Sequence, residues 1–232
     1  MSLEKPSTTS SFEEIKNAQE AIVSGIEEGM RLAHEYFKDY EARKLSIEIH
    51  EPLTPILMID DSDSNIPDDI RKMPACYSVK EGKLFINLDQ NNPHSLVHFL
   101  RKISNSENLK RKMQVISSFI AIHEYTHHIQ SLHGQFVNIT FDKLVEIEAQ
   151  ADYYAGKVFN YHSALRNILT KQDEDAILEF LALTGSDVDI ERIPGVIMDL
   201  KTGGGHDMGV IRKGNFLDGY TGVNNQFDFK KA

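Results

Sequence analysis

The chain contains 232 residues, of which 41% are hydrophobic and 26% are charged, a composition typical of a globular protein. Acidic residues outnumber basic residues by 35 to 25, so the formal net charge is -10. This charge argues against nucleic acid as a general partner, because no excess of Lys and Arg is present to neutralise phosphates. The single cysteine, Cys76, excludes an internal disulfide framework and a metal site built from several thiolates.

Signals for membrane insertion and secretion are missing from the sequence. The longest mostly apolar stretch, residues 115–122, is far shorter than the ~20 residues that a membrane-spanning helix needs. The first ten residues contain no apolar core of a secretory signal. We therefore expect a protein without a membrane segment that is located in the cytoplasm.

The first half of the chain is predicted to hold one long helix and a small sheet. Residues 1–10 are expected to be disordered, and Ser11 with Glu14 then forms a capping box. Apolar residues recur every three or four positions from there to Tyr40, which predicts a long amphipathic helix. Short apolar segments separated by polar turns predict three strands, over residues 45–49, 55–59 and 83–88.

The pattern becomes helical in the second half of the chain. Ser104 and Glu107 form another capping box, which opens a helix that is predicted to end near Leu132, before Gly134. Two further helices are predicted, over residues 142–161 and 173–183. No linker divides the chain, so we expect a single domain over residues 11–222, followed by a C-terminal tail over residues 223–232.

Inside the predicted central helix lies the segment His123-Glu124-Tyr125-Thr126-His127, an H-E-x-x-H match. Residues four apart share one helical face, so both imidazoles can reach the same ion. Glu124 lies about 100° further round the helix, near such an ion but not bound to it, where it can take a proton from water. The segment therefore predicts a zinc site with Glu124 as the catalytic base.

A catalytic zinc site needs a third protein ligand and leaves one position for water. His133 completes a near match to the metzincin pattern, but Gln130 replaces the glycine that lets the chain turn back. In a continuous helix, His133 lies about 15 Å along the axis from the first histidine. Glu148 and Asp152 share one face of the next predicted helix, whereas Glu146 points elsewhere. We favour Glu148 as the ligand, with Asp152 supporting a ligand histidine.

The segments His-Glu-Tyr-Thr-His-His-Ile-Gln and Glu-Ala-Gln-Ala-Asp-Tyr-Tyr-Ala-Gly, residues 123–130 and 148–156, resemble motifs of the bacterial neutral zinc metallopeptidase family. A looser likeness covers roughly residues 75–220 and includes His206 and Arg212, which are similar to the family's H-G-x-x-x-x-R ending. The second segment is also similar to the E-x-x-A-D motif of CAAX-type membrane peptidases, in which the glutamate binds zinc. The resemblance implies an α+β, zincin-like fold with a small N-terminal sheet beside a helical body.

Together these features predict a zinc-dependent peptidase that acts on a peptide or protein substrate. Residues 83–89 are expected to form the edge strand of the cleft, along which an extended substrate pairs its backbone. His206 is our candidate donor to the oxyanion, with Tyr153 and Tyr220 behind it. Two alternatives stay open: a catalytically silent zinc-binding scaffold or protein-interaction module of the same fold, and a hydrolase that acts on other bonds. The sequence predicts no oligomeric state.

Overall fold

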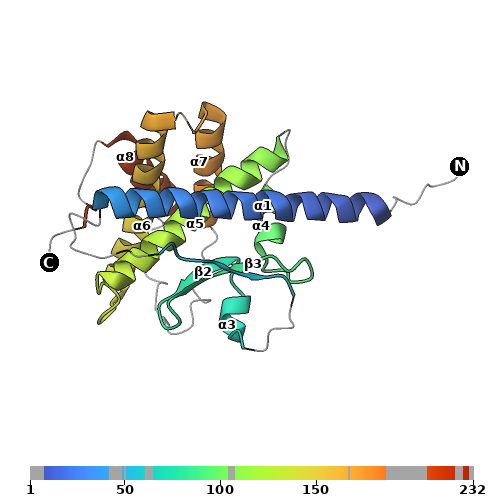
Figure 1. Ribbon diagram of the computed structural model, residues 1–232, viewed down its shortest axis with the longest axis horizontal. Coiled ribbons are helices and arrows are strands. Elements are labelled where there is room, and N and C mark those ends of the chain that lie inside the picture. The colour runs from blue at the N-terminus through green and yellow to red at the C-terminus, as the bar shows by residue number, and fades with distance from the viewer. Residues whose placement is uncertain are drawn as a thin grey trace, which may run out of the picture.

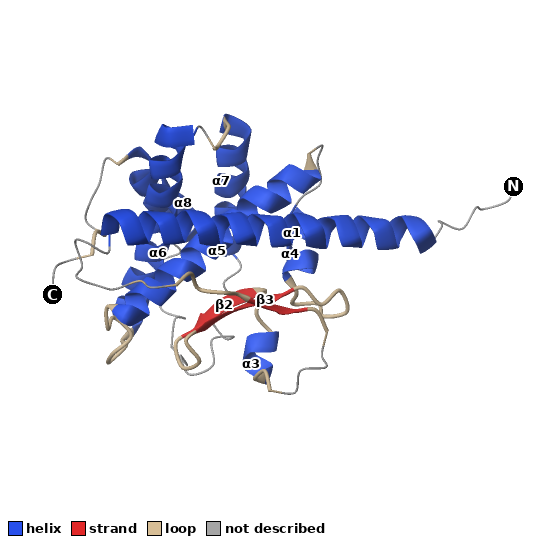
Figure 2. Ribbon diagram, in the orientation of Figure 1, coloured by secondary structure: helices blue, strands red, loops and turns tan. Residues whose placement is uncertain are grey.

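The computed structural model describes residues 8–41, 49, 51–60, 65–103, 108–166, 168–186, 208–222 and 227–229. Helices make up most of these residues, and a small sheet lies against them (Figures 1 and 2). The predicted α+β class, with a small sheet on a helical body, is therefore confirmed. In chain order the elements are α1 (Thr8–Tyr36), a short π-helical segment (Phe37–Glu41), β1 (Ile56–Met58), α3 (Asp68–Arg71), β2 (Ala75–Ser78), β3 (Lys83–Asn87), α4 (Leu96–Ile103), α5 (Leu109–Leu132), α6 (Phe141–Arg166), α7 (Lys171–Ser186) and α8 (Met208–Thr221).

The three strands form one sheet in the order β1-β3-β2, with β1 parallel and β2 antiparallel to β3. Side chains alternate along β3, so Leu84 and Ile86 enter the main helical core while Phe85 packs on the opposite face with Ile70 of α3. Figure 1 shows α3 below the sheet and the main helices above it. Because β3 is the central strand, the expectation that residues 83–89 form the edge of the cleft is wrong. The edge strand that is hydrogen-bonded to α5 is β2.

Helix α5 is the core of the helical body, and its residues 115–123 are all buried. Helix α1 crosses it (Figure 1), and the two backbones come close where α1 carries glycine. A Cβ atom added at Gly25 would lie 2.2 Å from the carbonyl oxygen of Gln114, and one at Gly29 would lie 2.4 Å from that of Ser118. The Ser118 hydroxyl also donates a hydrogen bond to the carbonyl oxygen of Gly25 (2.8 Å). The contact holds the helix that carries the H-E-x-x-H motif against the longest helix of the fold.

Helices α6 and α8 come equally close, through glycines on both. A Cβ atom added at Gly156 would lie 2.1 Å from the carbonyl oxygen of Phe216, and one at Gly219 would lie 1.9 Å from that of Tyr153. Neither position accepts a side chain unless the two helices move apart. This packing brings Arg212 of α8 within hydrogen-bonding reach of α6.

Helix α7 is tied to α5 by polar contacts at its N-terminus. Thr170 and Asp173 form a capping box, in which the Asp173 N–H donates to Thr170 Oγ1 (3.2 Å) and the Thr170 N–H donates to Asp173 Oδ2 (2.9 Å). Arg111 of α5 donates two further hydrogen bonds to this carboxylate (3.0 and 2.9 Å). Burial would raise the pKa of Asp173, but Arg111 and Thr170 hold it below its ordinary value. The ionised carboxylate therefore fixes where α7 starts.

Several predicted elements of the first half are present with shifted ends. Helix α1 begins at Thr8, so residues 8–10 are helical instead of belonging to the predicted disordered lead. Strands β1 and β3 fall within the predicted segments 55–59 and 83–88. The strand predicted over residues 45–49 lies, except for its last residue, outside the described part of the chain.

In the second half, α5 begins at Leu109, and the capping box predicted over residues 104–107 lies outside the described residues. Helices α6 and α7 extend beyond both ends of their predicted ranges. Residues 227–229 were assigned to a separate tail but pack on α6, where the Phe229 N–H donates to the Tyr154 hydroxyl (3.0 Å). Among the described helices, none is long and apolar enough to cross a membrane.

We expect Gly219→Ala to lower the free energy of unfolding by about 2 kcal/mol or more, because the added methyl group would overlap the backbone of α6. Gly214→Ala, in the same helix, is the matched control, since a Cβ atom there meets nothing within 4 Å. Replacing a helical glycine by alanine without overlap stabilises by about 0.5–1 kcal/mol. Urea unfolding of both variants is the measurement, and equal stabilities would contradict the close packing of α8 on α6.

Candidate metal centre

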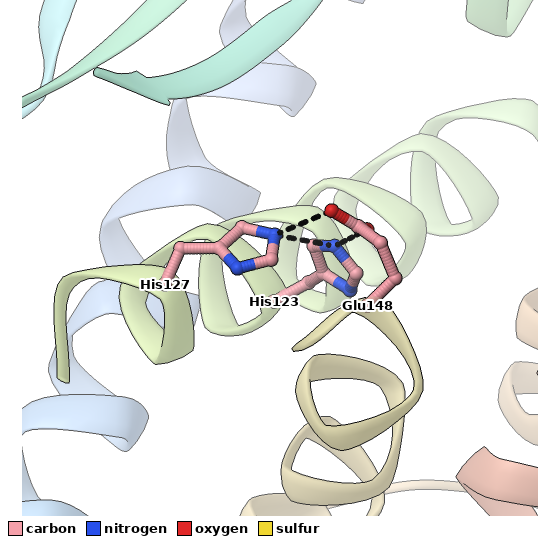
Figure 3. A group of neighbouring side chains, drawn as sticks. All are labelled: His123, His127 and Glu148. Carbon is pink, nitrogen blue, oxygen red and sulfur yellow. Dashed lines mark hydrogen bonds and ion pairs between the residues drawn. The ribbon is translucent and has the colours of Figure 1, made fainter. Parts of the chain in front are cut away.

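Three side chains from two helices meet beside the middle of α5 (Figure 3). His123 and His127 lie one turn apart on α5 and are 6% and 8% exposed, while Glu148 reaches them from α6. The two Nε2 atoms are 3.1 Å apart. The Glu148 carboxylate oxygens lie 3.2 Å from Nε2 of His123 and 3.4 Å from Nε2 of His127. One nitrogen or oxygen from each residue therefore lies within 4.8 Å of the others.

The distal ring nitrogens of both histidines are bound to acceptors. Nδ1 of His123 donates to Asp152 Oδ1 (2.9 Å), and Nδ1 of His127 donates to Gln130 Oε1 (2.7 Å). The amide of Gln130 cannot be reversed, because its Nε2 donates to the carbonyl oxygen of Ile147 (2.8 Å) and to Gln150 Oε1 (2.9 Å). In its neutral form, each imidazole therefore carries its proton on Nδ1 and presents the Nε2 lone pair.

Two Nε2 lone pairs and a carboxylate are thus aimed at one another. Acceptors that face each other in a buried position repel unless positive charge lies among them. The group of His123, His127 and Glu148 can accordingly hold a metal ion. About half of the Glu148 side chain (50%) stays exposed, so the group has an open side toward solvent.

The charges around this group also favour a cation. Burial would raise the pKa of Glu148, but the imidazoles of His127 and His123 hold it well below its ordinary value. Burial would lower the pKa of His123, yet Asp152 and Glu148 raise it to about 10. Without an ion, His123 therefore carries a second proton, on Nε2, at neutral pH. Metal binding has to displace this second proton.

Asp152, which orients His123, is itself held by Arg212 of α8. The guanidinium Nε donates to Asp152 Oδ2 and Nη2 donates to Oδ1, both at 2.8 Å, which is the strong bidentate form of an ion pair. Burial would raise the pKa of Asp152, but Arg212 and His123 hold it below its ordinary value. The carboxylate, which is 1% exposed, therefore stays ionised and keeps the histidine ring in one orientation.

Glu124 lies beside the metal-binding group and faces a different partner. Its Oε2 accepts a hydrogen bond from the backbone N–H of Tyr77 in β2 (2.7 Å). The phenol of Tyr77 in turn contacts Nδ1 of His128 on α5 (3.1 Å), so β2 is fastened to α5 at two points. Glu124 also lines a pocket of about 230 Å³ together with His123 and Glu148. A carboxylate that is not in the ligand group thus lines the pocket beside it.

The alternative third ligands lie elsewhere. Helix α5 continues to Leu132, so His133 occupies the C-cap and its ring packs against Phe229. Glu146 is exposed on α6 and does not belong to the group. The continuous helix thus keeps His133 away from the first two histidines, as the sequence argument required.

Of the three residues expected to stabilise an oxyanion, only Tyr153 and Tyr220 lie in the described part of the chain. His206 lies outside the described residues. The hydroxyl of Tyr153 donates to Asp228 Oδ1 (3.1 Å), and the ring of Tyr220 stacks on Phe216. Neither tyrosine is among the described residues that line the pocket.

Sequence reasoning gave no structural role to three residues that hold the site together. Gln130 received no role, although its position three residues after His127 places both on one helical face. Tyr77 carries no sequence signal, because it contributes a backbone N–H that any residue except proline has. Arg212 was indicated only by the family resemblance. Its ion pair joins it to a residue 60 positions away, so no local sequence pattern reveals it.

The chain was compared with models of known protein families, with curated proteins and with solved structures, and no significant match was found. The fold and the site by themselves define an α+β protein with a candidate metal centre shared by two helices. Any more particular assignment depends on the motifs and on the chemistry of the site residues.

We expect Glu148→Gln to weaken the binding of Zn²⁺, used as a probe ion, by more than about 100-fold. Loss of a ligand should exceed the roughly 10–100-fold effect that is typical of losing a residue that only supports a ligand. Glu146→Gln is the matched control, because Glu146 lies two residues earlier on α6 and is exposed. Competition with a chromogenic chelator measures both affinities, and an equal loss in the two variants would exclude Glu148 as a ligand.

Asp152→Asn should weaken Zn²⁺ binding by roughly 10–100-fold, because a neutral amide orients His123 less strongly and lowers its basicity. Asp142→Asn, which changes an exposed carboxylate in the first turn of the same helix, should leave the affinity unchanged. Circular dichroism establishes that both variants are folded. Wild-type affinity in folded Asp152→Asn would show that Asp152 has only a packing role.

Proposed function

We propose that the chain is a zinc-dependent peptidase of zincin-like fold, in which His123, His127 and Glu148 bind the metal and Glu124 is the catalytic base. This proposal rests on the position of Glu124. It follows a ligand histidine in the same helix, stays outside the ligand group, and lines the adjoining pocket. Catalysis by activated water needs such a carboxylate, and a structural metal site does not.

Zinc is the metal that suits this ligand set best. Two imidazoles and one carboxylate, with an open side, make up one of the usual ligand sets of catalytic zinc. Zinc bonds of about 2.0–2.2 Å in a tetrahedral arrangement separate the ligand atoms by about 3.3–3.6 Å. The two Nε2 atoms are 3.1 Å apart, while Oε2 of Glu148 lies 3.2 Å from Nε2 of His123 and Oε1 lies 3.4 Å from Nε2 of His127, all close to this range. The site therefore needs little rearrangement to accept the ion.

When bound, zinc supplies a Lewis acid for the substrate carbonyl and lowers the pKa of a water molecule. Glu124 accepts the proton of the attacking water and delivers it to the leaving amine. The Tyr77 N–H holds one oxygen of this carboxylate, which leaves the second oxygen for the water. His206 remains our candidate for stabilising the negative charge that develops on the carbonyl oxygen.

The family resemblance supports the same assignment. Residues 123–130 and 148–156 resemble the two motifs of the bacterial neutral zinc metallopeptidases, with His123, Glu124, His127 and Glu148 at the matching positions. Asp152 matches the aspartate of the second motif, and Arg212 matches the arginine of the ending. The ion pair between Asp152 and Arg212 gives these two positions a joint physical role.

A catalytically silent metal-binding scaffold is the main alternative. Structural zinc sites are usually closed by four protein ligands, whereas the described residues supply three and the group borders a pocket. This openness favours an enzyme over a scaffold. A hydrolase of other bonds would use the same water and the same base, and it differs only in its substrate.

We expect Glu124→Gln to keep the zinc content and the fold while the hydrolysis of unstructured polypeptides, such as casein and a mixed peptide pool, falls by about 10²–10⁴-fold or more. Glu146→Gln, an equal chemical change at an exposed position, should retain wild-type activity. Mass spectrometry of the products measures the rates. Activity that survives Glu124→Gln would exclude this mechanism, and a zinc-loaded wild type that cleaves none of the peptides would favour the scaffold.

A further inference from the structure

The pocket beside the candidate metal centre has an apolar side and a polar side of similar extent. It lies between α4, α5 and α7, next to the start of β2, and has a volume of about 230 Å³. His123, Glu124 and Glu148 lie on its polar side. The apolar walls are formed by Leu96, Phe99, Phe119, Ile120 and Phe180.

The aromatic walls are held in place by one another. The rings of Phe99 and Phe119 each meet the ring of Phe180 edge-on, with centroids 5.9 and 5.8 Å apart, an arrangement that aromatic pairs prefer. Phe119 also packs against the ring of His123 at 6.1 Å. The apolar surface thus continues directly up to the first metal-binding histidine.

The apolar side of the pocket disfavours an acidic occupant. Glu124 and Glu148 contribute carboxylates, and the guanidinium of Arg212 is already engaged by both oxygens of Asp152. A carboxylate that entered the apolar side would lose its hydration, and the Leu, Phe and Ile side chains offer it no hydrogen-bond donor. A large apolar side chain would meet none of these costs.

One edge of the pocket offers backbone groups to an extended chain. The carbonyl of Pro74, just before β2, accepts a hydrogen bond from the N–H of Asn87 at the end of β3. The N–H of Tyr77 in β2 points to the opposite side and donates to Glu124. Backbone groups alternate in direction along a strand, so the N–H and C=O of Ala75 face away from β3. Ala75 also lines the pocket. A strand that pairs with Ala75 would therefore carry its side chains past the aromatic walls.

We propose that this pocket binds a large apolar side chain, aromatic or aliphatic, of an extended polypeptide, next to the bond that is cleaved. The inference rests on the proposed peptidase function and adds a substrate class to it. Substrates are unfolded chain segments with an exposed large apolar residue, and segments with an acidic residue at that position are excluded. Folded proteins, which bury such residues, are poor substrates.

Because the chain contains no tryptophan, a peptide with a single tryptophan reports its own burial by fluorescence. The probe is a flexible octapeptide with a central tryptophan, and it is titrated with zinc-loaded Glu124→Gln protein, which cannot turn it over. Competing octapeptides carry Phe, Leu or Asp at the same position. We expect the Phe and Leu peptides to bind roughly 10–100-fold more tightly than the Asp peptide, the effect of burying one large apolar side chain. Equal affinities would overturn the inference.

A second test changes the pocket. Phe99→Asp places a carboxylate in a wall of the pocket and should abolish the preference for Phe over Asp, whereas Leu165→Asp, at a position 63% exposed on α6, should retain it. A preference that persists in folded Phe99→Asp would overturn the inference. The peptide comparison leaves the apolar side of the pocket unchanged, so it decides the question even if Phe99→Asp does not fold.

The two proposals can fail separately. If the wild type cleaves these peptides with equal kcat/KM for Phe and Asp, the side-chain pocket is wrong and the peptidase stands. If the Phe peptide binds selectively but the zinc-loaded wild type does not cleave it, the pocket stands and the peptidase function is wrong.

Discussion

Two buried imidazole nitrogens and a carboxylate face one another at 3.1–3.4 Å, and this repulsive arrangement is satisfied only by positive charge among them. Asp152 and Gln130 hold the two rings in this orientation. Asp152 accepts a hydrogen bond from Nδ1 of His123, and Gln130 accepts one from Nδ1 of His127. Neither ring can turn away or change its tautomer without breaking a buried hydrogen bond. Gln150 contacts Gln130 and Arg212 contacts Asp152, so both partners are themselves held by hydrogen bonds.

Helix α8 packs closely on α6 and carries Arg212, which contacts the candidate site. Because Gly219 of α8 and Gly156 of α6 carry no side chains, these helices lie close enough for Arg212 to grip Asp152 with two hydrogen bonds. An ionised, buried Asp152 then fixes the ring of His123, a candidate metal ligand. Helix α5 is held in the same manner by the glycines of α1. Glycines outside the candidate site thus determine how closely the helices that carry its residues can approach one another.

Strand β2 borders the pocket and is attached to α5 beside Glu124. It is fastened to α5 through the backbone N–H and the phenol of Tyr77, and its first residue, Ala75, borders the aromatic pocket. The neighbouring Cys76 is partly buried against the cluster that contains Phe85 and Ile70, and this burial raises the pKa of its thiol to about 12. The thiol therefore stays protonated near neutral pH, as expected for a cysteine without a catalytic role.

The sequence alone determined the features that depend on a single element. Helical periodicity placed His123 and His127 on one face with Glu124 beside them, and it placed Glu148 and Asp152 together on the next helix. Tertiary structure decided how these faces meet. The apolar run of β3 suggested a strand but not its central place, because strand order depends on pairing with other segments. The Tyr77–Glu124 and Arg212–Asp152 contacts join residues 47 and 60 positions apart. Periodicity describes the faces of one helix or strand, whereas these contacts arise only when separate elements pack together.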